Sequence, residues 1–251
     1  MEQFVRKLRS WMKSPDLDTL QKLICVQPHP DDADISMGAT VAKLSEKGVK
    51  IYYISVTDGS AGTRDESLLG QRLAEIRKKE QEKAGEILGV HELIWLDFED
   101  LGDYSLEQVR SKIVGIIRKI EPDAVFTVDP FAPYEVHPDH IKCGMSVAQA
   151  VSLYKLPKLL PGTSSHDVAI VGFFNTPFPN TFYPVERKHL DKKFQAISQH
   201  KSQFDEKTLQ MLFFYLTEKS KGYALEENKF VEVFKLLPPT ALHVMSEAYL
   251  L

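Results

Sequence analysis

The sequence predicts an α/β protein with a Rossmann-like, mostly parallel sheet that is covered by helices on both faces. Short runs rich in β-branched and aromatic residues alternate with longer segments of helical periodicity, which is typical of a parallel sheet with crossover helices. The chain has 251 residues and contains no internal repeat or linker-like tract. This length lies near the upper limit for one hydrophobic core. We therefore expect a single domain over residues 1–251, with a helical N-terminal extension over residues 1–20.

Three strands and two helices are predicted in the first half of the chain. Strands are expected over Lys22–Gln27, Val49–Thr57 and Leu93–Leu96, where buried or β-branched residues are concentrated. Helices are expected over Ser36–Lys47 and Ser67–Leu88, from the spacing of their apolar residues. Gly48 and Gly89 follow these helices at the position that commonly ends a helix.

The second half continues the alternation and adds loops rich in proline. We expect helices over Leu106–Ile120, from Pro138 to about Leu153, over Val185–His200 and over Lys207–Lys219. We expect strands over Ala124–Val128, Val168–Phe173 and Phe230–Leu236. Asp129–Val136 contains two prolines and is predicted to be a loop, and Pro157–Ser165 is rich in Pro, Gly and Ser.

Composition and charge exclude several classes of protein. The 31 Lys and Arg against 35 Asp and Glu give a net charge of -4, which argues against nucleic-acid binding. No apolar stretch is long enough to span a membrane, and the N-terminus lacks the apolar core of a secretory signal. Cys25 and Cys143 are expected to be buried free thiols. These features predict a cytoplasmic protein.

Polar residues gather where two predicted strands end. The first strand runs directly into PHPDD (28–32), and the fourth leads through the proline loop into HPDH (137–140). In open α/β sheets the ligand crevice lies outside the carboxyl ends of the strands, so both motifs can face one crevice. His and Asp suit zinc, and catalytic zinc keeps three protein ligands and one open position. His29, Asp32 and His140 would supply one such set.

Each motif also has a structural explanation. The paired aspartates could cap the helix that follows, and the second motif could be the start of a helix in which His137 and Asp139 act as caps. The two motifs together, each at a predicted strand end, favour a metal site. The remaining histidines in the body of the chain lack companions at metal-ligand spacing and are interpreted as surface or packing residues: His91, His166, His189 and His200.

These motifs resemble the signatures of the PIG-L/LmbE family of zinc-dependent N-acetylglucosaminyl deacetylases. Further stretches resemble its archaeal-type diacetylchitobiose deacetylases, namely TDGSAGTRDES (57–67), EIRKKE (75–80), WLDFED (95–100) and PYEVHPDH (133–140). The resemblance covers most of the chain after the first twenty residues. One departure is that the wider family often has Glu after the paired aspartates, where this chain has Ala33 followed by Asp34.

The resemblance implies a role for each residue of the two motifs. It implies one Zn²⁺ per subunit on His29, Asp32 and His140, Asp31 as the general base and then acid, a protonated His137 that stabilises the tetrahedral intermediate, and Asp139 as the carboxylate that orients and charges His137. Zinc lowers the pKa of bound water to about 7, which supplies a nucleophile at neutral pH.

Three further residues acquire roles only through the resemblance. By pattern alone Arg77 would lie on a solvated basic helix face, but the resemblance implies that Arg77 and Asp100 hold substrate hydroxyls. By pattern alone His243 would be a partly buried histidine in a strand or loop. The resemblance implies instead that His243 reaches the active site of a neighbouring subunit, in a homo-oligomer that is a trimer or hexamer.

The expected function is removal of the N-acetyl group from N-acetylglucosamine-type sugars, such as GlcNAc or diacetylchitobiose, with release of acetate and an amino sugar. A GlcNAc conjugate of malate or inositol is the alternative substrate. A nucleotide-binding protein is disfavoured because His29-Pro30 stands where a G-x-G-x-x-G loop would begin. A non-catalytic metal-binding protein is disfavoured because it would have no use for the additional carboxylate of Asp31.

Overall fold

The computed structural model describes residues 2–12, 14–162, 164, 166–226 and 229–251. Its helices are α1 (Glu2–Trp11), α2 (Asp32–Glu46), α3 (Gln71–Leu88), α4 (Leu106–Ile120), α5 (Pro138–Leu153), α6 (Arg187–Ile197), α7 (Glu206–Gly222) and α8 (Ala241–Val244). Its strands are β1 (Lys22–Gln27), β2 (Lys50–Thr57), β3 (Glu92–Phe98), β4 (Ala124–Val128), β5 (Ile170–Phe174), β6 (Thr181–Val185) and β7 (Phe230–Leu237). No helix among these residues is long and apolar enough to cross a membrane.

The described strands form one sheet in the order β3-β2-β1-β4-β5-β7-β6. The first five strands of this order pair in parallel, and β7 pairs antiparallel with both β5 and β6. The predicted mostly parallel sheet is therefore confirmed. The chain moves outward from β1 to β3 and then returns to the other side of β1 with β4. The strand order thus reverses between β1 and β4, which is where open α/β sheets place their ligand crevice.

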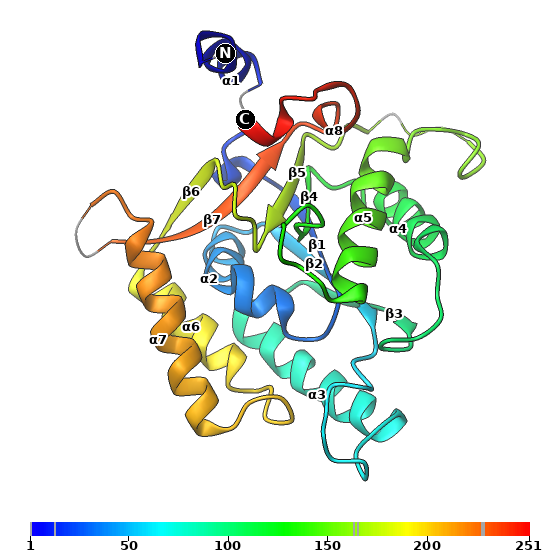
Figure 1. Cartoon of the computed structure of the whole chain (residues 1–251), viewed down its shortest axis with the longest axis vertical. Helices are drawn as coiled ribbons and strands as arrows, with labels where there is room; N and C mark the ends of the chain where they lie inside the picture. The colour runs from blue at the N-terminus through cyan, green and yellow to red at the C-terminus, as the bar shows by residue number, and fades with distance from the viewer. Residues whose placement is uncertain (1, 13, 163, 165, 227–228) are drawn as a thin grey trace.

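Helices cover both faces of the sheet (Figure 1). On one face, α4 and α5 pack together over alternate side chains of β1, β2 and β4, such as Ile24, Ile54 and Val125. On the other face, α2, α3 and α6 pack over the intervening side chains, such as Cys25 and Tyr53. Strands buried on both faces read as continuous apolar runs, which is why the sequence revealed them.

Helix α5 approaches the end of β4 closely because of one glycine. A Cβ at Gly144 would lie 2.6 Å from the carbonyl oxygen of Val128 and 2.9 Å from the ring of Pro130. Any larger residue would push the helix away from the strand. Because α5 carries Asp139 and His140 in its first turn, Gly144 sets how near these side chains come to the end of the sheet.

The structure differs from the prediction at several element boundaries. Strand β6 was not predicted, because Pro184 interrupts its pattern; as an edge strand, β6 tolerates a residue that has no N–H. Helix α2 begins at Asp32 and not at Ser36, since its first turn lies before a kink at Met37 and does not share the later apolar spacing. In the Pro/Gly/Ser-rich stretch, residues 163 and 165 lie outside the described residues.

Candidate active site

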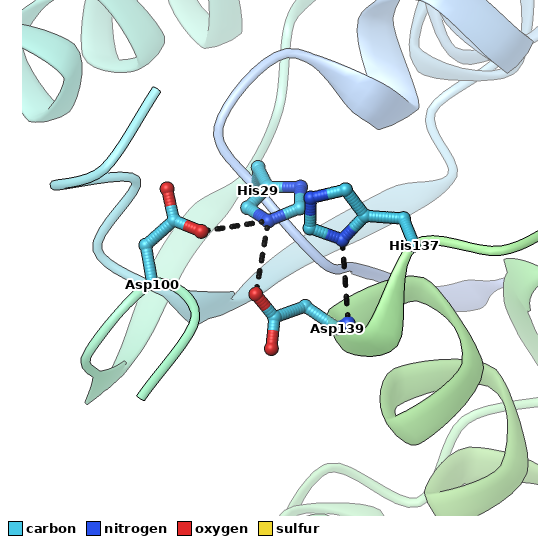
Figure 2. Close-up of side chains that lie close together, drawn as sticks. All are labelled: His29, Asp100, His137 and Asp139. Atoms are coloured by element: carbon cyan, nitrogen blue, oxygen red, sulfur yellow. Dashed lines mark hydrogen bonds and ion pairs between the residues drawn. The ribbon is translucent and has the colours of Figure 1, made fainter. Parts of the chain in front are cut away.

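The two sequence motifs meet beyond the carboxyl ends of the central strands β1 and β4. Figure 2 shows His29, from the turn after β1, beside His137, which immediately precedes α5. The ring centroids of these two histidines are 4.8 Å apart. The ring of His140 lies 5.3 Å from that of His29 and 5.1 Å from that of His137. Segments more than a hundred residues apart in the chain therefore form one cluster.

Among the residues that the structure describes, two overlapping groups of side chains could hold a metal ion. One group is His29, Asp32 and His140, and the other is His29, Asp100, His137 and Asp139; in each, one possible ligand atom per residue lies within 4.8 Å of the others. The two nitrogens of His29 face different groups. Its Nδ1 lies 3.3 Å from Asp32 Oδ2. Its Nε2 lies 3.2 Å from Asp100 Oδ1 and 3.5 Å from Asp139 Oδ2.

The two nitrogens of His140 also face different carboxylates. Its Nε2 lies 3.5 Å from Asp32 Oδ2, and its Nδ1 lies 2.9 Å from Glu135 Oε2. Metal-binding histidines almost always present one nitrogen to the ion and donate the other N–H to a carboxylate or carbonyl. The set of His29 Nδ1, Asp32 Oδ2 and His140 Nε2 has this form. Two imidazoles and one carboxylate suit zinc or a related divalent ion.

The electrostatics of the cluster also favour a cation. Burial opposes charge on His29, but the surrounding carboxylates of Asp100, Asp139 and Asp32 outweigh burial and raise the pKa of His29 well above its usual value. Burial likewise opposes ionisation of Asp32, yet His29 and His140 lower the pKa of Asp32 to about 2. Because a metal binds neutral imidazole, a bound cation would take the place of the proton that His29 otherwise holds.

Asp31 stands beside the donor set in a strained conformation. It is the residue before α2, with φ 119° and ψ -29°, a backbone region that costs on the order of 1–3 kcal/mol for a residue with a side chain. Its side chain is buried. Burial raises the pKa of Asp31, and the nearby carboxylate of Asp32 adds to the rise, which the Arg77 guanidinium opposes; the resulting pKa is about 6.

Arg77 is buried and holds the turn that contains Asp31. Its Nη2 donates to the Pro30 carbonyl at 2.7 Å and lies 3.2 Å from Asp31 Oδ2, while its Nη1 donates to the Gly59 carbonyl at 3.2 Å. A solvated helix face is therefore wrong for this residue, which is 3% exposed. Gly59 adopts φ 69°, and a Cβ there would lie 2.7 Å from Arg77 Nε. Contact of Arg77 with substrate stays a prediction.

The carboxylate of Asp139 forms its hydrogen bonds with residues other than His137, and its role in orienting and charging His137 stays a prediction. Its Oδ1 accepts from the Tyr104 hydroxyl at 2.6 Å and its Oδ2 from the Leu101 amide at 2.9 Å, with His29 Nε2 nearby. Only the backbone N–H of Asp139 reaches His137, donating to its Nδ1 at 3.3 Å. The reason is that His137 caps α5, so the side chain of Asp139 points away from it, as Figure 2 shows.

The pKa of His137 lies below its usual value in the metal-free protein. Burial lowers it most and the neighbouring His29 and His140 lower it further, while the carboxylates of Asp139 and Asp100 oppose the shift. Since its Nδ1 accepts the Asp139 N–H, the proton of the neutral imidazole is on Nε2. In its neutral form, His137 can donate a hydrogen bond from Nε2–H; a protonated His137 in the reaction stays a prediction.

Asp100 and His243 lie in very different places. Asp100 is buried after β3, where its Oδ2 accepts from the Ala61 amide at 3.1 Å and its Oδ1 lies against His29. His243 is exposed on α8. Leu237 at the end of β7 pairs with Val171 near the start of β5. Helix α8 therefore follows β7 at the end of the sheet opposite to the carboxyl ends of the parallel strands, where the cluster lies. The structure therefore brings Asp100 into the cluster and leaves His243 outside it.

Sequence reasoning missed the polar residues that support the cluster. Glu135 binds His140, and Tyr104 binds Asp139. Gln81 of α3 accepts from the Asp31 amide at 2.9 Å. His200, interpreted above as a surface or packing residue, is fully buried and bonded to Asp34 at 2.8 Å. Only Glu135 carried a usable signal, because it lies inside the PYEVHPDH stretch.

Glu135 offers a test of the metal assignment. Glu135→Gln should lower metal affinity roughly 10- to 100-fold, the usual loss when the outer partner of a ligating histidine is weakened. The dissociation constant for Zn²⁺, measured by competition with a chromogenic chelator, checks this. The matched control is Glu121→Gln, in the surface turn after α4. An unchanged constant for Glu135→Gln would mean that His140 does not present its Nε2 to a metal.

The chain is similar to known proteins over most of its length. Residues 24–151 match the family model PIG-L, described as GlcNAc-PI de-N-acetylase. The match runs from β1 into α5 and thus contains both motifs of the cluster. Diacetylchitobiose deacetylase of Thermococcus kodakarensis is 35% identical over 238 residues, which cover 92% of this chain and 89% of that protein.

A solved structure and a Bacillus protein are also similar to this chain. The solved structure of N,N'-diacetylchitobiose deacetylase from Pyrococcus horikoshii with its inhibitor MPG superimposes with a TM-score of 0.89 and 32% identity, covering 100% of this chain and 96% of that one. A probable N-acetyl-alpha-D-glucosaminyl L-malate deacetylase of Bacillus cereus is 35% identical over 141 residues, 54% of this chain and 62% of that protein. On sequence and fold together, this chain belongs to the PIG-L family of de-N-acetylases.

Proposed function

We propose that this protein is a metal-dependent hydrolase that removes the N-acetyl group from N-acetylglucosamine-type sugars, with diacetylchitobiose as the preferred substrate. The proposal rests on Asp31, which has a buried carboxylate and a strained backbone and lies next to a donor set of two histidines and one carboxylate. A site that only stores metal needs no such carboxylate. The likeness to two diacetylchitobiose deacetylases over nearly the whole chain supports the substrate class.

In the proposed reaction, His29, Asp32 and His140 hold the metal, and zinc is the ion that this donor set favours. When bound, zinc lowers the pKa of a coordinated water to about 7 and polarises a carbonyl oxygen. Asp31 accepts the proton of the attacking water and passes it to the nitrogen of the leaving amine. In the metal-free protein burial raises the pKa of Asp31 to about 6, which lies nearer to neutral pH than the usual value of an aspartate. Acetate and a free amino sugar are the products.

Arg77, beside Asp31, and His137, beside the metal ligands, complete this chemistry. Arg77 lies 3.2 Å from Asp31 Oδ2, so Oδ1 is the oxygen that handles the proton. His137, whose Nε2 carries a proton, donates to the oxyanion that forms as the acetyl carbonyl is attacked. A fixed donor of this kind contributes on the order of 3 kcal/mol to stabilising the transition state.

Acetate release tests the proposal directly. The zinc-loaded protein should release acetate from diacetylchitobiose, lose this activity with a chelator and regain it with added Zn²⁺. GlcNAc and GlcNAc-malate, assayed in parallel, distinguish the substrate classes. A strong preference for the malate conjugate would favour the alternative that the Bacillus relative suggests. No release from any of the three by fully metallated protein would contradict the proposal.

We also infer that the active enzyme is a homo-oligomer working in a reducing cytoplasm, with His243 of one subunit at the crevice of another. Exposed apolar side chains beside the cluster support a covering partner: Leu101, Tyr134 and Val136 are 58%, 94% and 84% exposed. His243 is itself exposed and lies outside its own subunit's cluster. Cys25 and Cys143 are buried, free thiols, which suits a reducing compartment.

A mixing experiment tests the role of His243. His243→Ala should reduce turnover of the disaccharide while zinc content and the mass from light scattering stay unchanged. Mixed and exchanged Asp31→Asn and His243→Ala subunits should recover part of the acetate release, because some crevices then combine an intact Asp31 with an intact His243. The matched control is a mixture of Asp31→Asn with His140→Ala, whose defects lie in the same crevice. A fully active monomer would refute the inference.

A further inference from the structure

Four fully buried polar side chains form a group that is linked to the Asp31 amide by a hydrogen bond from that amide to α3. Its members are Gln27, Asp34, Gln81 and His200, each with 0% exposure. They come from β1, from the first turn of α2, from α3 and from the segment after α6. None of them belongs to the metal donor set or to the proton transfer proposed above. Burying four polar side chains is costly unless each has hydrogen-bond partners, so their arrangement needs an explanation.

The bonds within this group set the orientation of the Gln81 amide. Its Nε2 donates to Asp34 Oδ2 at 2.9 Å, and His200 Nε2 contacts the same oxygen at 2.8 Å. Because Asp34 Oδ2 accepts this hydrogen bond, the NH₂ end of Gln81 faces Asp34. The carbonyl end must then face the opposite way. That end accepts from the Asp31 amide at 2.9 Å and from Gln27 Nε2 at 2.9 Å.

The Asp31 amide is the point at which the backbone is strained. With φ 119° the residue needs outside contacts to keep its conformation. Gln81 and Arg77 supply them from one face of α3, four residues apart, which is the spacing of neighbours on a helix. Arg77 binds the Pro30 carbonyl and the Asp31 carboxylate, and Gln81 binds the N–H between them. The two side chains therefore hold the Pro30–Asp31 peptide group through both its carbonyl and its N–H.

We propose that Gln81, locked by Asp34 and His200, is a positioning residue that holds the Asp31 carboxylate in the geometry required for proton transfer. This inference rests on the proposed function, in which Asp31 moves the proton. It also gives a role to the acid at position 34. Gln81 does not touch the reacting atoms; it acts through the backbone of Asp31.

Gln81→Met tests this role, because methionine keeps the length of the side chain and removes its three hydrogen bonds. We expect kcat for acetate release to fall about 10- to 100-fold, as a small misplacement of a reacting group can cost. KM should stay within about twofold, and the zinc content should not change. In zinc-loaded protein the Asp31 amide should lose its protection against hydrogen exchange, measured by NMR.

A polarity-reversed pair provides the rescue. Gln81→Glu alone places two carboxylates against each other and should also lower kcat. In Gln81→Glu with Asp34→Asn, the amide of the new Asn can donate to the new Glu and to a neutral His200, while the Glu still accepts from the Asp31 amide. This double variant should recover at least about tenfold of the lost kcat and restore the protection of the Asp31 amide.

The matched control is Ser220→Ala, which removes two buried hydrogen bonds between α7 and Val231 of β7. It should lower Tm and leave kcat within about twofold. Wild-type kcat in Gln81→Met, a raised KM with unchanged kcat, or loss of zinc would each overturn the inference. An inactive wild-type protein would instead contradict the proposed function. In that case hydrogen exchange at Asp31 in the same variants would still decide whether Gln81 holds its backbone.

Discussion

Asp31→Asn should reduce the rate of acetate release roughly 10²- to 10⁴-fold and leave the metal in place. Asparagine keeps the shape of the side chain and can still accept from Arg77, 3.2 Å away, but it cannot take a proton from water. Because His29, Asp32 and His140 are unchanged, zinc content should match that of the wild type. Steady-state kinetics on diacetylchitobiose and metal analysis of the same samples measure both quantities.

The raised pKa of Asp31 also predicts how this substitution changes the stability of the metal-free protein. A pKa of about 6 lies above the usual 3.8, so the folded metal-free protein binds this proton more tightly than the unfolded chain does. Ionised Asp31 therefore destabilises the metal-free fold above about pH 6. Asp31→Asn should raise Tm at pH 8 relative to the wild type, and the difference should disappear below pH 4. Near-normal turnover in this variant would place the base elsewhere.

The second large effect is expected for His140→Ala, which should remove metal and activity together. The substitution removes one of three ligands, so metal affinity should fall by more than the 10- to 100-fold that an outer partner contributes. Acetate release should then fall below detection at micromolar zinc. Metal content by atomic spectroscopy and acetate release from the same dialysed sample provide the measurement.

The control for this substitution is His91→Ala, at an exposed histidine after α3. It should leave both quantities unchanged, which separates the site from adventitious binding of zinc to surface imidazoles. Full zinc retention by His140→Ala would point to the overlapping group of His29, Asp100, His137 and Asp139. The same result with retained activity would also contradict the proposed mechanism.

Much of the fold was predictable because its central strands are buried on both faces. Lys22–Gln27 and Ala124–Val128 were predicted with the bounds that the structure has, since such strands form continuous apolar runs. The edge strand β6 was not, because an edge strand has fewer packing constraints and its sequence includes a proline. The start of α2 was missed for a related reason: its first turn consists of residues that serve the site, not the core.

The meeting of the two motifs was also predictable, but the partner of each side chain was not. Residues at the carboxyl ends of neighbouring parallel strands must lie close together, so His29 and His140 were expected at one site. The family resemblance implied that the carboxylate of Asp139 orients and charges His137. In the structure this carboxylate binds Tyr104 and Leu101, from a segment that only folding brings to the start of α5.

By itself the sequence determined the class of fold, the edge of the sheet where the chemistry lies and the kinds of ligand available there. These follow from local patterns: apolar runs, helical periodicity and the residues next to strand ends. Only the tertiary structure decided which nitrogen of each histidine faces Asp32, which nitrogen of His137 accepts the Asp139 N–H, and the burial of Arg77. Hydrogen bonds depend on distances and angles between segments far apart in the chain, and no local pattern encodes them. Gln81 shows this most clearly, since an ordinary helix residue in the sequence holds the strained backbone of Asp31 in the fold.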